Sequence, residues 1–403
     1  MVNPLTATGN PLTVLQSQRA AQGGGTAQAS QILQGGQASL NRSQQYIEKA
    51  TEGLKEEVER RAEPYDLKIE RLEGEVNDWI DVRTEIAQGR AAATNGQDAL
   101  KTVDDKLTEM RRSLLKYKET GSDLYKDQYF NALRELNVAV GGASDEYNLT
   151  GQQNKITHEP NTISYTNDRT NGETELRGVY AGTGFYVDVS QKNGSAHDST
   201  WVADMDILTM TEYSTYDADE PEKSDETGLS GSLKNGFTLN TDPGTIDYDS
   251  DSVTIQFTHE SSGNTFTGTV ERGGLSVMPG WFYGGFTDGS GNPNGAAIDR
   301  ALDDIGQAKN ELGGLQAIMD NNVTKVENDQ NQADRAVEQL REEISQTRTD
   351  KAVAVRAFQQ HEQAEIEDMR QSLEAAQQSS SYTRIFQGFV NSSNNPLFIS
   401  ANI

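Results

Sequence analysis

The sequence predicts an α+β fold in which long N- and C-terminal helices pack as a coiled-coil bundle, with a central β-rich insert. Three observations predict it: a heptad-like apolar spacing in residues 95–117, a similar spacing from Ile298 onward, and alternating, Gly- and Thr-rich sequence between them. A narrow apolar seam on a helix needs partner helices to bury it. We therefore expect the two helical arms to close on each other.

The N-terminal seam places apolar residues at alternating spacings of three and four, which lines them up on one helix face. Its members are Leu100, Val103, Leu107, Met110, Leu114 and Tyr117. The C-terminal arm repeats the pattern with Ile298, Leu302, Ile305, Leu312, Leu315 and further apolar residues. These two sets are the predicted helical core.

Several positions are expected to interrupt the helices. Pro64 should kink or break the first one, because proline lacks the backbone N–H and clashes with the preceding turn. Gly89 and residues 91–96 suggest a bend or an irregular stretch in the first arm. Gly313-Gly314 and Asn321-Asn322 suggest interruptions of the C-terminal arm. Gly121 should separate the long helix from a shorter one that stops at Gly141-Gly142.

The insert shows strand signals. Residues 252–258 alternate between apolar and polar, residues 184–189 and 201–213 are further candidates, and residues 265–270 should form a hairpin with the strand before them. Residues 217–228 are typical of an exposed acidic loop. The aromatic segment 273–286 is interpreted as the patch that joins the insert to the helical body.

Composition changes divide the chain into five segments: 1–41 and 378–403 as terminal assembly segments, 42–144 and 296–377 as helical cores, and 145–295 as the β-rich variable insert. The end segments hold one charged residue each, Arg19 and Arg384. They are either disordered tails or segments buried on assembly, since uncharged segments are cheaper to desolvate. The apolar residues that would carry such assembly are Leu12, Leu15, Ile32, Leu33, Ile385, Phe386, Phe389 and Val390.

The overall charge narrows the class of partner. The 403 residues carry a net charge of -27, and the chain contains no cysteine. Such acidity argues against nucleic acid or an anionic membrane as the main partner. No apolar run of about 18 residues suggests membrane insertion, and no classical signal opens the chain. Export would then use a route that does not read such a signal.

No motif points to catalysis. The four histidines, at 158, 197, 259 and 361, lack metal-ligand spacing, and no phosphate-binding loop or nucleophile elbow is present. We expect no enzyme activity, no cofactor and no metal site. The one weak calcium candidate is the turn with Asp247, Asp249 and Asp251, but Ser252 stands where the loop needs glycine and Thr258 where it needs glutamate.

A family resemblance adds to this reading. Residues 95–111, Asn-Gly-Gln-Asp-Ala-Leu-Lys-Thr-Val-Asp-Asp-Lys-Leu-Thr-Glu-Met-Arg, resemble the N-terminal core of bacterial flagellins, whose helix has the form Ala-Leu-x-x-(Ile/Val)-x-x-x-Leu-x-x-Met-Arg. Residues 127–136 look like the family's second, shorter helix. Residues 297–305 and 312–316 are similar to its C-terminal core, in which an Ala-Ile-Asp-x-Ala-Leu helix precedes a Leu-Gly-Ala-x-Gln-like stretch. The resemblance covers about a third of the chain.

The sequence also departs from the family. Residues 56–75 are highly charged where flagellins carry an Arg-Ile-Asn segment, the Asp-Ala-Asp near the C-terminal bend is missing, and the C-terminal arm is longer. A divergent flagellin, a hook–filament junction relative and a different filament subunit all remain open.

The resemblance implies a structural subunit of an extracellular helical filament, a bacterial flagellum or a similar surface filament. Such a subunit is secreted, polymerises through its terminal helices and exposes its variable domain. Its partners would be copies of itself and an export chaperone, with no nucleic acid and no membrane insertion. The alternative is a secreted or virion coiled-coil protein with a β-rich recognition head, which forms a closed oligomer.

Overall fold

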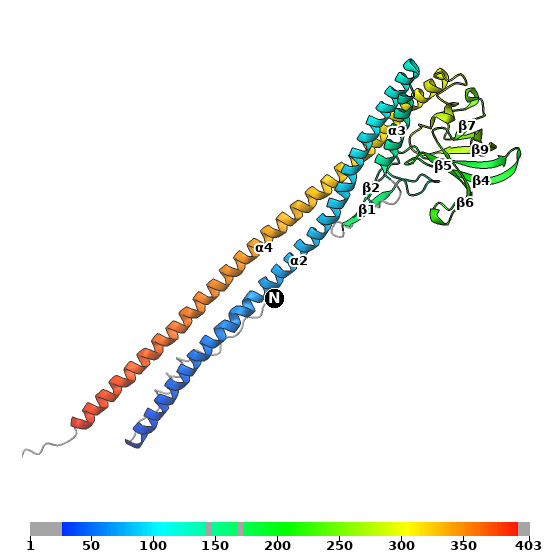
Figure 1. The fold of residues 1–403 in the computed structure, drawn as a ribbon. Coiled ribbons are helices and arrows are strands. Elements are labelled where there is room, and N and C mark those ends of the chain that lie inside the picture. The colour runs from blue at the N-terminus through cyan, green and yellow to red at the C-terminus, as the bar shows by residue number, and fades with distance from the viewer. Residues whose placement is uncertain (1–25, 142–146, 168–171, 394–403) are drawn as a thin grey trace, which may run out of the picture. The chain divides into compact units, whose positions relative to one another are not determined.

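The computed structural model describes residues 26–141, 147–167 and 172–393 (Figure 1). It is an α+β protein, as predicted, with a long N-terminal helix, an antiparallel β region and a long C-terminal helix. The helices are α2 (Thr26–Thr120), α3 (Asp123–Val140) and α4 (Gly295–Ser393). The strands are β1 (Thr162–Asn167), β2 (Gly172–Arg177), β3 (Phe185–Lys192), β4 (Ser195–Asp204), β5 (Thr209–Thr215), β6 (Asp225–Ser232), β7 (Phe237–Leu239), β8 (Ser252–His259) and β9 (Asn264–Arg272).

The chain divides into two compact units. The helical unit comprises Met1–Gly74 with Leu340–Ile403, and the sheet-bearing unit comprises Glu75–Gln339. Both boundaries fall inside long helices, not at the composition changes that the sequence displays. Each unit is described by itself below.

In the sheet-bearing unit, α2 and α4 run antiparallel and side by side (Figure 1). Residue numbers fall along one helix as they rise along the other. The polar contacts that join them are Lys309–Asp104 at 2.8 Å, Gln97–Asp320 at 2.7 Å and Arg83–Asp334 at 3.1 Å. Exposed pairs of this kind stabilise a fold only slightly, so the buried apolar seam must supply most of the stabilisation.

The helical unit shows the same antiparallel arrangement. Its interhelical pairs are Lys351–Asp66 at 2.5 Å, Arg348–Glu73 at 2.7 Å and Lys68–Glu343 at 2.9 Å. The Arg61 guanidinium lies 4.1 Å from the ring centroid of Phe358, a cation–π distance. Leu72 and Ile344 are buried.

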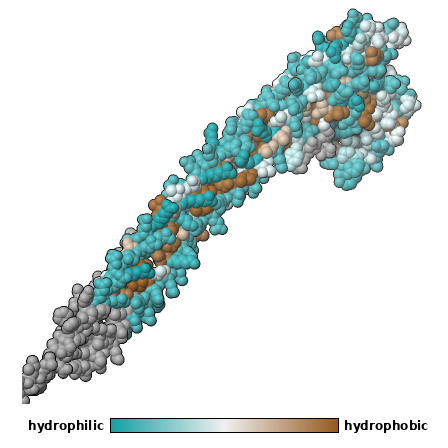
Figure 2. All heavy atoms as spheres, turned by 60° about the vertical axis from the view of Figure 1, so that its left-hand side comes forward, coloured by the Kyte–Doolittle hydropathy of each residue, from teal (hydrophilic) through white to brown (hydrophobic). Residues whose placement is uncertain are grey.

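The seam in α2 is closed to solvent. Leu100, Val103, Leu107, Met110, Leu114 and Tyr117 are each at most 1% exposed. On the surface of the helices, by contrast, hydrophilic side chains dominate, and apolar ones form a narrow, interrupted strip (Figure 2). The heptad-like spacing therefore identifies side chains that the fold removes from water.

The predicted break at Pro64 is wrong, because α2 continues through it. Pro64 faces solvent, and its missing hydrogen bond costs about 3 kcal/mol. The exposed pairs of Asp66 and Lys68 with α4 contribute only slightly against that cost, so burial of neighbouring apolar side chains such as Leu72 must outweigh it. The predicted interruption at Gly313-Gly314 is also wrong, since each exposed glycine costs only about 1 kcal/mol relative to alanine.

The irregular stretch predicted around Gly89 and residues 91–96 is wrong too, because α2 continues through it. Gly89 and Gly96 instead lie where side chains of other elements come close to the α2 backbone. A Cβ at Gly96 would lie 2.7 Å from the Met319 sulfur, and one at Gly89 would lie 3.0 Å from the Tyr165 ring. Asn322 does not interrupt α4 either. It is buried, and its side-chain amide donates to the Arg177 carbonyl of β2 at 2.8 Å.

The stop after the first helix is confirmed. Gly121 follows α2 with a φ of +66°, a conformation that glycine adopts without strain. The shorter helix α3 then ends at Gly141, whose N–H donates to the carbonyls of Asn137 and Val138. Local glycine chemistry alone was enough to predict both ends.

The strands form two antiparallel sheets. β1 and β2 make a hairpin, and the other seven follow the order β6-β5-β4-β3-β9-β8-β7. Three predictions are confirmed: the strand at 252–258 (β8), the strand at 184–189 (β3) and the β8–β9 hairpin. The segment 201–213 is two strands, β4 and β5, joined by a turn in which Leu208 has a φ of +55°. The acidic loop is shorter than predicted, because residues 225–228 belong to β6.

An aromatic core fills one face of the seven-stranded sheet. The Trp201 ring lies 5.2 Å from that of Phe266 and 5.4 Å from that of Phe237, both edge to face. The short helix η3 (Gly280–Tyr283) brings Trp281 within 5.6 Å of Phe237. All of these side chains are buried.

Leu107 allows a matched test of the seam. We expect Leu107→Ala to lower the free energy of unfolding by about 2–5 kcal/mol, since a buried leucine leaves a cavity. Leu115→Ala, on the same helix with its side chain 44% exposed, should change it by less than about 0.5 kcal/mol. Urea unfolding followed by circular dichroism measures both, and equal losses would contradict the assignment of the seam.

Candidate functional site

The predicted helical-core residues gather in the sheet-bearing unit. Leu100, Val103, Leu107, Met110 and Leu114 of α2 and Ile298, Ile305 and Leu312 of α4 are buried, whereas Leu302 and Leu315 are half-buried. Lys106 of α2 also bonds Glu135 of α3 at 2.5 Å. The sequence-predicted set therefore lies where α2, α3 and α4 meet.

The predicted terminal assembly residues are outside what can be described. Leu12 and Leu15 lie in the part of the chain without a described structure. Ile32, Leu33, Ile385, Phe386, Phe389 and Val390 fall within α2 and α4, but their side chains are outside the described residues. Their role stays a prediction.

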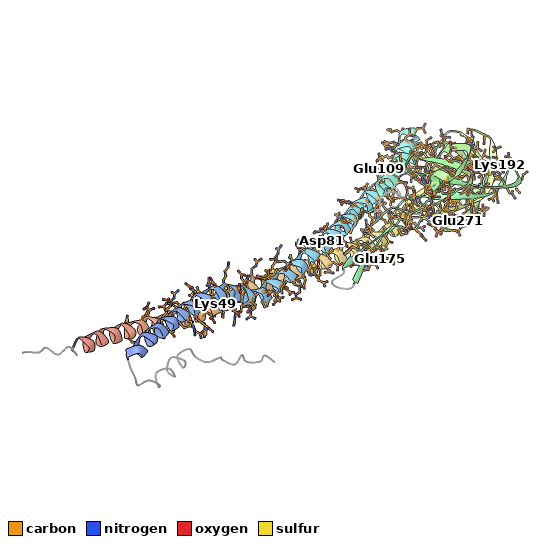
Figure 3. All side chains as sticks on the ribbon, turned by 90° about the horizontal axis from the view of Figure 1, so that it is seen from below. Lys49, Asp81, Glu109, Glu175, Lys192 and Glu271 are labelled. Atoms are coloured by element: carbon orange, nitrogen blue, oxygen red, sulfur yellow. The ribbon has the colours of Figure 1, made fainter. Side chains whose placement is uncertain are left out.

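The β1–β2 hairpin docks on the helices through polar contacts. The hydroxyls of Tyr165 and Thr174 both donate to one carboxylate oxygen of Asp329 in α4, at 2.8 and 2.7 Å. Lys325 donates to the backbone carbonyl of Glu175 at 3.1 Å; Glu175 marks the hairpin in Figure 3. Together with Gly89 and Asn322, these contacts fix one end of the insert to both long helices.

The aromatic segment fixes the insert at a second place, as predicted. The Tyr129 hydroxyl of α3 donates to the Met278 carbonyl at 2.8 Å, and the Tyr129 ring meets that of Phe286 edge to face at 4.9 Å. The Tyr283 hydroxyl accepts from the Met278 N–H at 3.0 Å and donates to Asp304 of α4 at 2.8 Å. The segment therefore bonds both α3 and α4.

Asp304 is a buried carboxyl at this junction. Burial raises the pKa of Asp304 to about 7, although the hydrogen bond from Tyr283 and the charge of Arg272 lower it in part. The carboxyl is 4% exposed. Near neutral pH this group is therefore only partly ionised, and its protonation changes the charge inside the helix–insert junction.

A second buried carboxylate, Glu212, lies within the sheet. It accepts hydrogen bonds from Thr227 at 2.6 Å, Ser199 at 2.9 Å and His197 at 3.0 Å, and Lys192 lies 3.8 Å away. Lys192 is labelled in Figure 3. Burial by itself would raise the pKa of Glu212, but these bonds and the Lys192 charge lower it. The carboxylate thus joins four neighbouring strands.

Sequence reasoning missed the Glu212 cluster, although a signal was present. Glu212 alternates in phase with the buried Met210 along β5 and pairs across from Trp201 on β4. An acidic residue in a core-facing position needs partners. Ser199 and His197 both bond the carboxylate, not each other, so this arrangement does not activate the serine as a nucleophile.

In the turn predicted as a weak calcium site, the positively charged side chain of Arg272 binds the backbone. The Arg272 guanidinium donates to the carbonyls of Tyr248 and Ser250. The backbone N–H of Asp249 donates to the side-chain carboxylate of Asp247 at 3.1 Å. Within the described residues, Asp247, Asp249 and Asp251 do not bring their carboxylates together as a set of metal ligands, so the turn is an Arg-bound acidic turn.

One other group brings possible metal ligands together. His361, Glu362 and Glu365 lie on one stretch of α4 in the helical unit, with ligand atoms within 4.8 Å of one another. Each ring nitrogen of His361 faces a different glutamate at 3.9 Å. His361 and Glu365 are exposed, and an exposed group of this kind on one helix face is not by itself a metal site.

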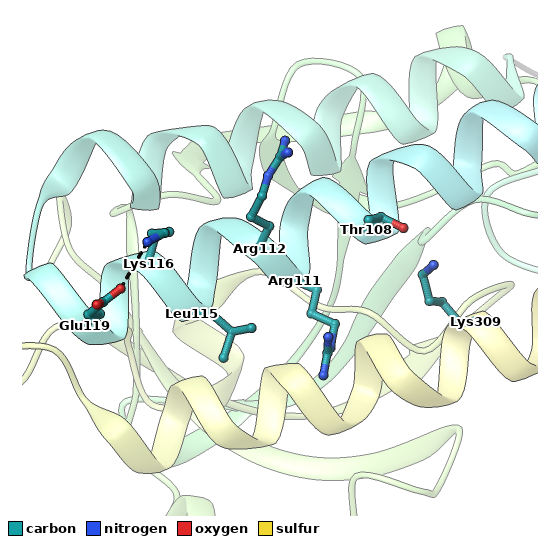
Figure 4. Close-up of a pocket in the computed structure, with 7 residues that line it drawn as sticks. All are labelled: Thr108, Arg111, Arg112, Leu115, Lys116, Glu119 and Lys309. Carbon is teal, nitrogen blue, oxygen red and sulfur yellow. Dashed lines mark hydrogen bonds and ion pairs between the residues drawn. The ribbon is translucent and has the colours of Figure 1, made fainter.

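A shallow groove with basic walls runs along α2 in the sheet-bearing unit (Figure 4). It is lined by Thr108, Arg111, Arg112, Leu115, Lys116, Glu119 and Lys309. Arg111 points toward α4 and Arg112 toward α3, while Lys116 pairs with Glu119 at 3.2 Å. In so acidic a chain, the groove is a local basic surface.

In residues 26–141, 147–167 and 172–393, none of the helices contains an apolar stretch that could span a lipid bilayer.

Asp304→Asn tests the junction carboxyl. The aspartate titrates near 3.8 in the unfolded chain and near 7 in the fold, so the folded state holds more protons between these values and wild-type stability falls as pH rises through them. Asparagine keeps an acceptor for Tyr283 and carries no charge. We expect the variant to gain up to about 4 kcal/mol relative to wild type between pH 4 and 7. Urea unfolding across this range measures the gain, and a pH-independent difference would contradict it.

Glu212→Gln tests the sheet carboxylate. Because the fold lowers the pKa of Glu212, its stabilisation is present above its unfolded value near 4.5 and is lost as pH falls below it. We expect a loss of about 3 kcal/mol at pH 7, read from tryptophan fluorescence during unfolding. The loss should shrink in acid. Glu260→Gln, at an exposed position, is the control and should behave as wild type.

No protein-family model matches this chain, and no curated protein sequence matches it significantly.

Proposed function

We propose that this protein is a structural subunit of an extracellular helical filament, similar to a flagellin, that polymerises through its two end segments. The observation that carries the proposal is the antiparallel pairing of α2 and α4 within each unit. Each of these paired helices leads into one of the two nearly uncharged chain ends. A filament subunit of this kind needs such paired ends.

We also propose that α2 and α4 pack as a coiled coil. Ile305, Leu312, Met319, Val326 and Ala333 recur every seven residues in α4, and each is buried. A sustained seven-residue repeat keeps the buried face turned toward a partner helix. The opposing positions on α2 follow the three-and-four spacing from Leu100 to Tyr117.

Assembly would proceed by ordering the end segments against neighbouring subunits. Residues 1–41 and 378–403 carry one charge each, so their burial between subunits desolvates few ions. The entropy lost on ordering would be offset by apolar contacts that form only in the polymer. Before assembly, an export chaperone would cover the same segments.

The acidic insert suits the outer surface of such a filament. Acidic side chains outnumber basic ones by more than three to one in residues 145–294. A strongly negative surface keeps polymers soluble and opposes non-specific association. The two anchored contacts, at Asp329 and Asp304, would hold the insert on the helical body.

Electron microscopy of the full chain beside residues 42–377 tests the proposal. After a salt or precipitant trigger, we expect filaments from the full chain and none from the truncated one, because the truncation removes the end segments. Circular dichroism and tryptophan fluorescence must show that the truncated chain keeps its helices and insert.

Discrete particles of fixed stoichiometry from both chains would overturn the filament proposal. That outcome would favour a secreted coiled-coil protein with a β-rich recognition head, since a closed oligomer does not grow at its ends.

A further inference from the structure

At the helix–insert junction, a carboxyl and a guanidinium lie within electrostatic reach of each other but form no ion pair. Asp304 is buried and accepts one hydrogen bond, from the Tyr283 hydroxyl at 2.8 Å. Arg272 is half-buried and donates to backbone carbonyls, and it forms no ion pair with a described residue. Burial raises the pKa of Asp304, and the Arg272 charge lowers it in part, so the two groups do act on each other.

Arg272 has a hydrogen-bond donor to spare. One terminal nitrogen donates to the Tyr248 carbonyl at 2.6 Å and to the Ser250 carbonyl, and the other reaches the Ser276 carbonyl at 3.5 Å. The Nε–H is buried and has no acceptor among the described residues. A buried donor without an acceptor is costly. An ionised carboxylate would bind the guanidinium more strongly than these carbonyls do, because both partners would be charged.

The protonation state of Asp304 decides whether such a carboxylate is present. Burial raises the pKa of Asp304 to about 7, so the carboxyl is mostly neutral below this pH and mostly ionised above it. A neutral buried carboxyl needs no cation. An ionised one is costly to bury unless a cation pairs with it.

The surroundings of Asp304 leave Arg272 as its counter-ion. The other titratable and charged groups around it are Tyr129 of α3, Tyr283 of η3, Tyr248 and Asp249 of the turn before β8, and Asp303 and Arg300 of α4. Burial raises the pKa of each of these tyrosines, so they stay neutral near pH 7. The two aspartates oppose a further negative charge. Arg300 already contacts the Tyr248 ring and the Tyr283 carbonyl.

The turn that Arg272 binds, residues 247–251, is itself packed on the junction. The Tyr248 ring stacks on that of Tyr283 at 5.6 Å and meets that of Phe282 edge to face at 5.6 Å. The Tyr248 carbonyl is one of the two that Arg272 binds in this turn. The position of Arg272 therefore determines how firmly the turn is held against η3.

We propose that Arg272 is a switch with two positions, set by the proton on Asp304. With Asp304 neutral, Arg272 binds the carbonyls of Tyr248 and Ser250 and holds the turn. When Asp304 loses its proton, Arg272 pairs with the carboxylate and releases the turn. The surface of the insert before β8 thus changes as the pH rises through neutrality. This switch goes beyond the filament proposal and does not depend on it.

Hydrogen–deuterium exchange of the full chain tests the switch. The reporter is a peptide of residues 247–252, which includes the Ser250 amide bonded to the Asp247 carbonyl at 3.3 Å. The ionised fraction of Asp304 should rise from about one tenth at about pH 6 to about nine tenths at about pH 8. After correction for the chemical exchange rate, we expect exchange in this peptide to rise by up to about tenfold over the same range.

Three variants separate the two groups. Asp304→Asn should keep slow exchange in the reporter peptide at both pH values, because Arg272 stays on the turn. Arg272→Gln should exchange fast at both, because the turn has lost the cation that holds it. Asp303→Asn removes an exposed carboxylate from the neighbouring position of α4, so it is the matched control and should keep the pH step.

A wild-type chain without the step, or Asp304→Asn with a full step, would overturn the proposal. A full step in Arg272→Gln would also contradict it, since the turn would then loosen without any movement of Arg272. An equal rise in peptides from β9 would indicate general opening of the insert and would exclude the switch. Tryptophan fluorescence verifies that each variant folds. Arg272→Lys, with the same expected result, replaces Arg272→Gln where that variant does not fold.

Discussion

Burial of one narrow apolar seam is the constraint on which the sheet-bearing unit depends. Leu107 and its neighbours on α2 cannot leave water unless α4 returns antiparallel beside them. That return requires the chain between the two helices to begin and end near the same place. The insert meets this requirement through its contacts with the helices, since the β1–β2 hairpin bonds Asp329 and the segment after β9 bonds Asp304, both on α4. Burial of the helix seam thus constrains where the insert begins and ends.

Polar groups on α4, of which Asn322 and Asp304 are buried, then specify how the insert attaches. Asp329 takes two hydroxyls from the β1–β2 hairpin, Asn322 bonds β2, and Asp304 takes the Tyr283 hydroxyl. Apolar packing alone tolerates shifts, whereas a buried polar atom is satisfied in one arrangement only. All three residues lie on α4, so this helix carries both buried apolar residues of the seam and the polar groups that fix the position of the insert. Gly89 and Gly96 supply the space that these close contacts need on α2.

Charge is distributed unevenly along the chain. The two end segments are almost uncharged, whereas the insert is strongly acidic. Uncharged surfaces are the ones that association can desolvate at low cost. A polymer built through the ends, as proposed above, would bury the uncharged segments and leave the acidic insert to water.

The sequence by itself determined the features that depend on nearby residues. The three-and-four spacing predicted the buried side of α2, the alternation in residues 252–258 predicted β8, and Gly121 and Gly141 predicted where helices end. Only the tertiary structure decided whether Pro64 and Gly313 break a helix, which carbonyls Asn322 and Arg272 bind, and what surrounds Asp304 and Glu212. The physical reason is that a periodicity is local, whereas the environment of a buried polar group or a mid-helix proline is made by residues that are distant along the chain and meet only in the fold.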